Sequence, residues 1–160
     1  MLALPGAALA AVTPRVLTFA HLHTAERLTV QYSDGIRYLP DALGAINHLL
    51  RDFRNGAQHA IDPRLLDLLH ALHGVTGSTR PFEIISGYRS PQTNTMLRRT
   101  GSGGVASGSL HMRGQAIDLR LADVPLASLR DAALSLGRGG VGYYPSSNFV
   151  HVDTGRVRRW

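Results

Sequence analysis

The sequence of 160 residues contains no cysteine. Without thiol groups the chain can form neither a disulfide framework nor a thiolate metal site, so any metal has to be held by histidine and carboxylate side chains. No run of about 18 apolar residues is present either, and we therefore expect no membrane-spanning helix. The length and the hydrophobic content of 44% predict a single folded domain with a core of its own.

Acidic residues are also scarce, because 11 Asp and Glu stand against 17 Lys and Arg, which gives a net charge of +6. A basic chain favours acidic partners such as nucleic acid, anionic lipid or an anionic polymer. The densest basic cluster is the segment 156–160, RVRRW. Because no nucleic-acid-binding motif accompanies it, we interpret this segment as a solvated terminal strand with outward arginines, and we expect no nucleic-acid partner.

Residues 1–12, MLALPGAALAAV, differ in composition from the rest of the chain. They are small and apolar and include Ala8-Leu9-Ala10, a triplet of the kind that signal peptidases cleave after. The positively charged start of a signal peptide is missing. We interpret the segment as the remnant of an export signal, which predicts a periplasmic location and a single domain over 13–160. The alternative is an apolar arm that packs on the domain.

Turn signals and hydrophobic spacing divide this domain into short strands and helices. The predicted strands are 16–23, 27–33, 82–86, 115–121, 141–144 and 149–154. The predicted helices are 40–54, 63–73, 91–99 and 125–136, and the glycine-rich segment 100–108 is predicted as a loop beside a site. Since helices and strands do not alternate regularly, the predicted fold class is α+β, a small antiparallel or mixed sheet with helices on one side.

Eight histidines make the choice of metal ligands the main question. His21 and His23 share a face of a predicted strand and could hold zinc, but we interpret them as histidines on a solvated strand face. His70 and His73 lie near the C-terminal end of a predicted helix, where a cationic ring complements the helix dipole. We do not expect these four histidines to bind a metal.

His111 differs from them because Asp118 follows it seven positions later. Gly114, between the two, permits a tight bend, so both side chains can point to one place. On the predicted strand, Asp118 lies on the face opposite Ile117 and Leu119, which belong to the core. A carboxylate among apolar neighbours is costly unless a positive group meets it.

The segment SNFVHVDTG supplies a third candidate ligand, His151, in the middle of the last predicted strand. Taken alone, it reads as a buried strand histidine. Together, two histidines and one aspartate give three nitrogen and oxygen ligands and leave the fourth tetrahedral position of zinc open to water, as in catalytic zinc sites. We therefore predict one Zn²⁺ per chain, held by His111, Asp118 and His151.

Three ordered motifs, SGYRSPQTN, SLHMRGQAIDLRL and FVHVDTG, resemble those of the LAS group of zinc peptidases, named for lysostaphin, D-Ala-D-Ala peptidases and sonic hedgehog. Within that group the chain is most similar to the murein endopeptidase branch MepK. The similarity covers residues 17–160. It implies the LAS fold and a zinc-dependent peptidase.

The resemblance also implies roles for individual residues. The S-x-H-x6-D motif of the group corresponds to Ser109, His111 and Asp118, and its late metal histidine corresponds to His151. Its GYR arginine corresponds to Arg89, which in such enzymes faces the substrate and stabilises the carbonyl oxygen that becomes negative. We expect Arg89 and Ser109 to bind substrate; the alternative for Arg89 is a structural salt bridge.

One position departs from the pattern of the group. Many of its members carry a carboxylate three residues before the last metal histidine, where it takes a proton from the attacking water, and here that position is Asn148. Asp153 shares the strand face of His151 and is the candidate replacement. It acts either as the general base or as a support that holds a ligand histidine in place.

The sequence thus predicts a monomeric zinc murein endopeptidase that hydrolyses the peptide cross-links of peptidoglycan stem peptides. Both the D-Ala to diaminopimelate link and the diaminopimelate to diaminopimelate link remain open as substrates. Two alternatives remain as well. One is a D,D- or L,D-carboxypeptidase that trims stem peptides, and the other is a non-catalytic zinc-bearing domain that binds the cell wall.

Overall fold

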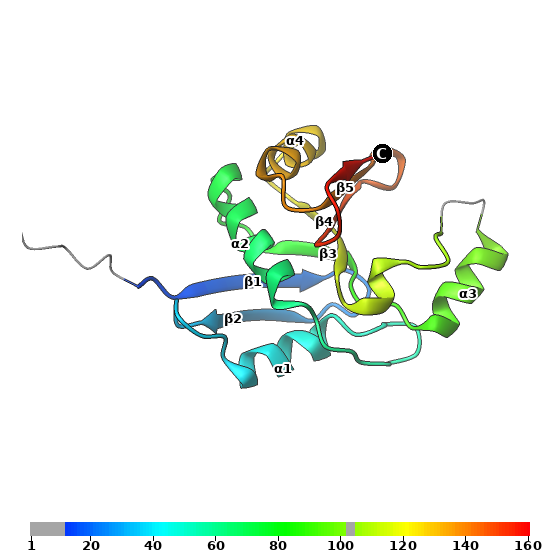
Figure 1. Cartoon of the computed structure of the whole chain (residues 1–160), viewed down its shortest axis with the longest axis horizontal. Helices are drawn as coiled ribbons and strands as arrows, with labels where there is room; N and C mark the ends of the chain where they lie inside the picture. The colour runs from blue at the N-terminus through cyan, green and yellow to red at the C-terminus, as the bar shows by residue number, and fades with distance from the viewer. Residues whose placement is uncertain (1–11, 102–104) are drawn as a thin grey trace, which may run out of the picture.

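A computed structural model describes residues 12–101 and 105–160 of the chain (Figure 1). The predicted export-signal remnant, 1–12, lies outside the described residues except for Val12. None of the helices in the described part has the length and apolar character that crossing a bilayer requires.

The described residues form one seven-stranded sheet with the spatial order β2-β1-β3-β4-β6-β5-β7. The strands are β1 (Arg15–His21), β2 (Arg27–Ser33), β3 (Phe82–Ser86), β4 (Ala116–Leu121), β5 (Gly140–Tyr144), β6 (Phe149–Asp153) and β7 (Arg158–Arg159). The pairs β1–β3 and β5–β7 are parallel and the other neighbours are antiparallel, so the sheet is mixed.

Helices pack against this sheet and confirm the α+β fold class (Figure 1). The α-helices are α1 (Pro40–Leu49), α2 (Pro63–Thr76), α3 (Pro91–Thr100) and α4 (Leu126–Leu136), and the short 3-10 helices are η1 (Leu110–Arg113) and η2 (Pro145–Ser147). Helix α4 contacts β4, β5 and β6, and α2 contacts both α4 and β1. Their leucines form one core with the inward side chains of the sheet.

The first helix ends earlier than the predicted 40–54, because tertiary contacts take the hydrogen-bonding groups that would extend it. The carbonyl oxygen of Leu50 accepts from the amide of Tyr88 at 2.8 Å. The Arg54 amide donates instead to the side chain of Asp52 at 3.1 Å. An aspartate side chain competes with helical hydrogen bonding in this way. The residues after α1 therefore hold the turn that follows β3.

Other boundaries differ less from the predictions. Helix α2 begins as predicted, with the Asp62 side chain accepting from the Arg64 amide, but it continues through Gly74 and ends at Thr76. Gly77 then caps it in the left-handed conformation. Strand β7 and helix η1 were not predicted, since two and four residues are too few to show a hydrophobic period.

The bend between His111 and β4 depends on Gly114. Its φ of +64° lies in the left-handed region, and a Cβ atom there would overlap the backbone carbonyl of Ala60. The carbonyl of Gly114 accepts from the Asp62 amide at 2.9 Å, which ties the bend to the start of α2. This confirms the predicted tight bend and explains why it has a fixed direction.

We expect Gly114→Ala to lower the free energy of unfolding by more than about 2 kcal/mol, because the left-handed conformation and the backbone overlap both oppose a side chain. Gly56→Ala is the matched control. Its φ of +76° is also left-handed, but a Cβ atom there meets nothing within 4 Å, so only the conformational cost of about 1 kcal/mol should appear. Denaturant unfolding measures both. Equal losses in the two variants would show that the packing against Ala60 does not matter.

Candidate metal centre

Strands β4 and β6 place two of the predicted ligands opposite each other. Asp118 and His151 are direct partners in the antiparallel register, while the adjacent pair of Ile117 and Val152 points into the core. Helix η1 supplies His111 from the loop before the Gly114 bend. In the part of the chain that the structure describes, these three ligands form the one group of three or more histidines and carboxylates able to hold a metal, with donor atoms within 4.8 Å of one another.

The separations of the donor atoms fit a zinc ion. Nε2 of His111 lies 3.2 Å from Nδ1 of His151 and 3.3 Å from Oδ1 of Asp118. The third distance, from Nδ1 of His151 to Oδ1 of Asp118, is 2.9 Å. Ligands about 2.0 Å from a tetrahedral zinc are about 3.3 Å from one another. The three atoms thus have the spacing of one face of a zinc tetrahedron.

In each histidine ring, the nitrogen outside the donor cluster has a partner, and this contact directs the other nitrogen toward the cluster. Nδ1 of His111 lies 2.8 Å from the carbonyl oxygen of Gly87, which can only accept, so Nδ1 carries the proton. Nε2 of His151 lies 3.0 Å from the carboxylate of Asp153. In neutral rings, Nε2 of His111 and Nδ1 of His151 carry lone pairs that face the Asp118 oxygen, with no proton between them. Such a cluster of acceptors fits a cation.

The electrostatics of the three side chains agree with that fit. They are 3%, 6% and 8% exposed for His111, Asp118 and His151, so solvent screens them little. Burial alone raises the pKa of Asp118, but the two imidazoles outweigh it and hold this pKa well below its usual range. Burial alone lowers the pKa of His151, but Asp118 and Asp153 outweigh it and raise this pKa. The first shift keeps Asp118 an anion, and the second shows that the two carboxylates attract positive charge to His151.

Asp153 lies on the far side of the His151 ring from the donor cluster. One of its oxygens accepts from Nε2 of His151, and Arg158 donates to both, at 3.1 and 2.8 Å. The amides of Gly140 and Gly155 complete its hydrogen bonds at 3.0 and 2.9 Å. With both oxygens occupied and no exposed surface, Asp153 has the contacts of a support for His151.

Arg89 follows β3 in a turn that buried groups hold in place. The Ser90 amide donates to the buried side chain of Asp52 at 2.9 Å, and the Arg89 amide donates to the His111 carbonyl at 3.2 Å. The guanidinium lies 4.0 Å from Asp118, and a 3.4 Å hydrogen bond joins it to Asn94. Among the described residues its buried Nε has no acceptor. These loose contacts differ from those of a structural salt bridge and leave donors available to a ligand.

A cavity of about 370 Å³ opens over the donor cluster. Its walls include the three predicted ligands, Arg89 and Ser109, which are joined by the aromatic side chains of Tyr144, Phe149 and Trp160. Helix η1 with the residue before it, strands β4 and β6, and the turn after β3 therefore bring every predicted site residue to this cavity except Asp153, which lies behind His151.

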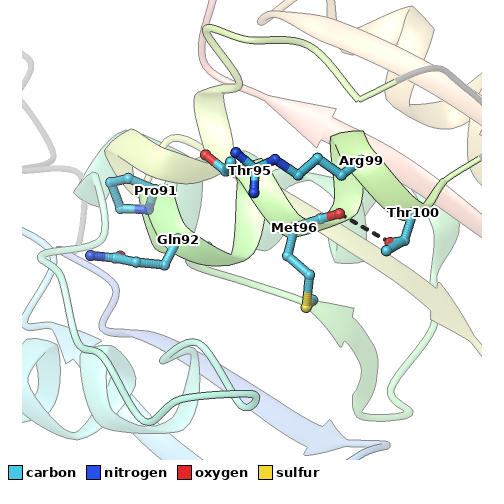
Figure 2. A pocket seen from close by; sticks show the side chains of 6 residues that line it. All are labelled: Pro91, Gln92, Thr95, Met96, Arg99 and Thr100. Carbon is cyan, nitrogen blue, oxygen red and sulfur yellow. Dashed lines mark hydrogen bonds between the residues drawn. The ribbon is translucent and has the colours of Figure 1, made fainter.

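A second hollow lies on the outer face of α3, away from these residues. Figure 2 shows its six lining side chains, from Pro91 to Thr100, along one helix. They include one titratable side chain, Arg99, and none of the predicted site residues. The chemistry of this chain therefore centres on the cavity over β4 and β6.

The other histidines do not converge with the ligands, but two of them differ from our interpretation. His21 is 1% exposed, so it does not lie on a solvated strand face; burial lowers its pKa to about 4. Its Nδ1 accepts from the His23 amide at 3.2 Å. His73 stacks on Phe82, and burial lowers its pKa, so it does not act as a cation at the helix end. Both rings complete the packing of β1 or α2.

The interpretation of segment 156–160 as a strand with outward arginines is wrong for Arg158. This side chain turns inward, because the buried carboxylate of Asp153 needs a cation. Trp160 also folds back toward the cavity, with its ring 5.2 Å from that of His151. The inward direction of both side chains could not be predicted, because a two-residue strand gives no pattern from which to assign faces. A glycine-rich run at 139–142 was the available signal of a close approach.

Comparison with known proteins identifies the family. The family model described as Peptidoglycan L,D-endopeptidase MepK matches residues 9–160. The Peptidoglycan L,D-endopeptidase MepK of Escherichia coli is 47% identical over 154 residues, which cover 96% of this chain and 84% of the relative. The Probable peptidoglycan L,D-endopeptidase MepK of Haemophilus influenzae is 45% identical over 161 residues, with 98% and 86% covered. The chain therefore belongs to the peptidoglycan L,D-endopeptidase MepK family of peptidases.

Proposed function

We propose that the chain is a zinc-dependent endopeptidase that hydrolyses L,D-peptide cross-links of peptidoglycan in the periplasm. The convergence of His111, Asp118 and His151 is the observation that carries this proposal, since three buried donors at zinc spacing lie at the floor of an open cavity. A catalytic zinc site needs three protein ligands and one position open to water and substrate.

When bound, zinc would polarise the peptide carbonyl and make hydroxide available at neutral pH. The protein residues supply the rest. Arg89 is always charged and has donors without firm partners, so it can bind the carbonyl oxygen as negative charge develops there. Gly87 and Asp153 hold the outer nitrogens of the ligand histidines, which fixes the orientation of both rings.

In this proposal Asp153 supports His151, the second of its two expected roles. Its two oxygens accept five hydrogen bonds, and removing a proton from water would require breaking one of them. Asn148 sits at the end of η2 with a positive φ of 54° and offers no carboxylate either. Among the described lining residues of the cavity, Asp118 is the one carboxylate. Its oxygen belongs to the donor cluster.

The substrate class follows from the family and from charge. An L,D-endopeptidase cuts a bond between an L-centre and a D-centre, which among the two predicted cross-links is the diaminopimelate to diaminopimelate link. Such stem peptides carry carboxylates, and the net charge of +6 and the arginines that line the cavity suit them. Ser109 lines the same cavity as Arg89 and can contact the peptide.

We expect His111→Ala and Asp118→Ala each to lose bound zinc and to lower peptidoglycan hydrolysis by more than about 100-fold. Loss of a residue that only hydrogen-bonds to a metal ligand already lowers metal affinity or activity by about 10- to 100-fold. His48→Ala is the control, because this exposed histidine lies outside the donor cluster. Metal analysis of the purified variants and release of soluble peptides measure the effect. A zinc-free variant that retains full hydrolysis would exclude the proposed site.

For Arg89→Ala we expect zinc content to stay the same while kcat falls by about 10²- to 10³-fold, the cost of removing an oxyanion donor. Arg89→Lys should recover part of this loss, because the charge remains but the two parallel donors do not. Arg99→Ala, an exposed arginine of α3, is the control. Unchanged kcat in Arg89→Ala would assign the guanidinium a structural role.

Product analysis distinguishes the proposed activity from its alternatives. We expect incubation of sacculi with the zinc-loaded protein to remove diaminopimelate-linked dimers and to release intact monomers, as mass spectrometry of muropeptides would show. Shortened monomers with unchanged dimers would identify a carboxypeptidase. Binding to sacculi without any released peptide would identify a non-catalytic domain. Loss of D-Ala-linked dimers alone would exclude the L,D specificity and retain the endopeptidase.

A further inference from the structure

Strand β5 contains an unusual set of close approaches to the segment after β6. A Cβ atom on Gly140 would lie closer than 3.0 Å to both Asp153 and the Arg158 guanidinium. A Cβ atom on Gly142 would lie 2.7 Å from the Trp160 ring. These two glycines share one face of the strand. Side chains from residues 153–160 therefore occupy space that only glycines leave open.

Arg158 uses this space to reach a carboxylate with no exposed surface. Its guanidinium donates to Oδ1 of Asp153 at 3.1 Å and to Oδ2 at 2.8 Å, a bidentate pair. Bidentate guanidinium–carboxylate pairs are directional as well as strong. The same Oδ2 accepts from Nε2 of His151 at 3.0 Å. A continuous chain of contacts thus runs from Arg158 through Asp153 to the metal-facing ring.

Two further contacts hold Arg158 itself. The pairing of β7 with β5 places Arg158 beside Gly140 in parallel register. The guanidinium carbon lies 4.8 Å from the Trp160 ring centre, at cation–π distance. The Trp160 ring is fixed in turn by a 2.7 Å hydrogen bond from its Nε1 to the hydroxyl of Tyr144. The arginine is therefore part of the wall of the site and not a freely moving surface group.

We propose that Arg158 is a positioning residue of the metal centre: it fixes the Asp153 carboxylate, which orients the His151 ring so that Nδ1 faces the metal. The inference rests on the proposed zinc site. It assigns to segment 158–160 a function in shaping that site. Neither the three sequence motifs nor the set of three ligands indicates such a function. Arg158 need not touch the substrate in this role.

The main competing role for Arg158 is substrate binding, because its half-buried side chain also lines the cavity. A guanidinium that bound a carboxylate of the stem peptide would act on KM and leave zinc affinity unchanged. A positioning residue would act on zinc affinity and kcat and leave KM nearly unchanged. The two roles thus predict opposite patterns in the same measurements.

The test compares Arg158→Met and Arg158→Lys with Arg159→Met, whose side chain lies on the opposite face of β7 and points toward α4. For Arg158→Met we expect zinc affinity, measured by competition with a chelator, to fall by about 10- to 100-fold. The ring ¹⁵N signals of His151 in the metal-free protein should also change. Arg158→Lys should lie between wild type and Arg158→Met, and Arg159→Met should match wild type.

If Arg158→Met does not fold, Gly140→Ala serves as the second variant, because its methyl group would overlap both the Arg158 guanidinium and the Asp153 carboxylate and so disturb their pairing while all charges remain. Gly44→Ala, where a Cβ atom meets nothing within 4 Å, is its control. We expect the same loss of zinc affinity in Gly140→Ala as in Arg158→Met.

Two results would overturn the inference: wild-type zinc affinity and His151 signals in the Arg158 variants, or a rise in KM alone. The zinc and ¹⁵N measurements need no substrate, so they decide the role of Arg158 even if the protein fails to hydrolyse peptidoglycan. Conversely, loss of hydrolysis in His111→Ala together with unchanged zinc affinity in Arg158→Met would retain the proposed function and exclude the positioning role.

Discussion

The antiparallel register between β4 and β6 is the constraint on which the site depends. It sets Asp118 directly opposite His151 and sets Ile117 opposite Val152, on the other face of the sheet. Because side chains alternate, a slip of one residue in either strand would send a ligand into the core and an apolar side chain into the cavity. The core therefore stabilises the ligand geometry, since burial of Ile117 and Val152 selects the register that pairs the ligands.

The third ligand depends on a different kind of contact. His111 comes from a short 3-10 helix, whose few internal hydrogen bonds would not hold it in place. Backbone groups on both sides supply the missing restraint, since His111 bonds to the Gly87 carbonyl through its ring and to the Arg89 amide through its own carbonyl. The same two contacts fix the turn that carries Arg89. The candidate ligand His111 and the arginine proposed to bind substrate are thus positioned together.

The buried negative charge of Asp153 determines which residues surround the candidate ligand His151. Burial alone raises the pKa of Asp153, but His151 and Arg158 outweigh it and hold this pKa well below its usual range. An ionised carboxylate without solvent is costly unless donors surround it, and the structure supplies these from β5, β7 and the turn after β6. The glycines of β5 provide the room. The contacts that satisfy the Asp153 carboxylate thus also hold the ring of His151, a candidate ligand.

The fold class, most of the strands and the three candidate ligands could be predicted from the amino-acid sequence. These features follow from local patterns, since strand alternation assigns faces and a glycine permits the bend between His111 and Asp118. Long-range contacts, in contrast, set where α1 ends and why His21 is buried. They also turn Arg158 inward and place Asp153 behind His151. Each of these features depends on a residue distant in the sequence, as the carbonyl of Leu50 depends on the amide of Tyr88. A local sequence pattern cannot predict such a partner.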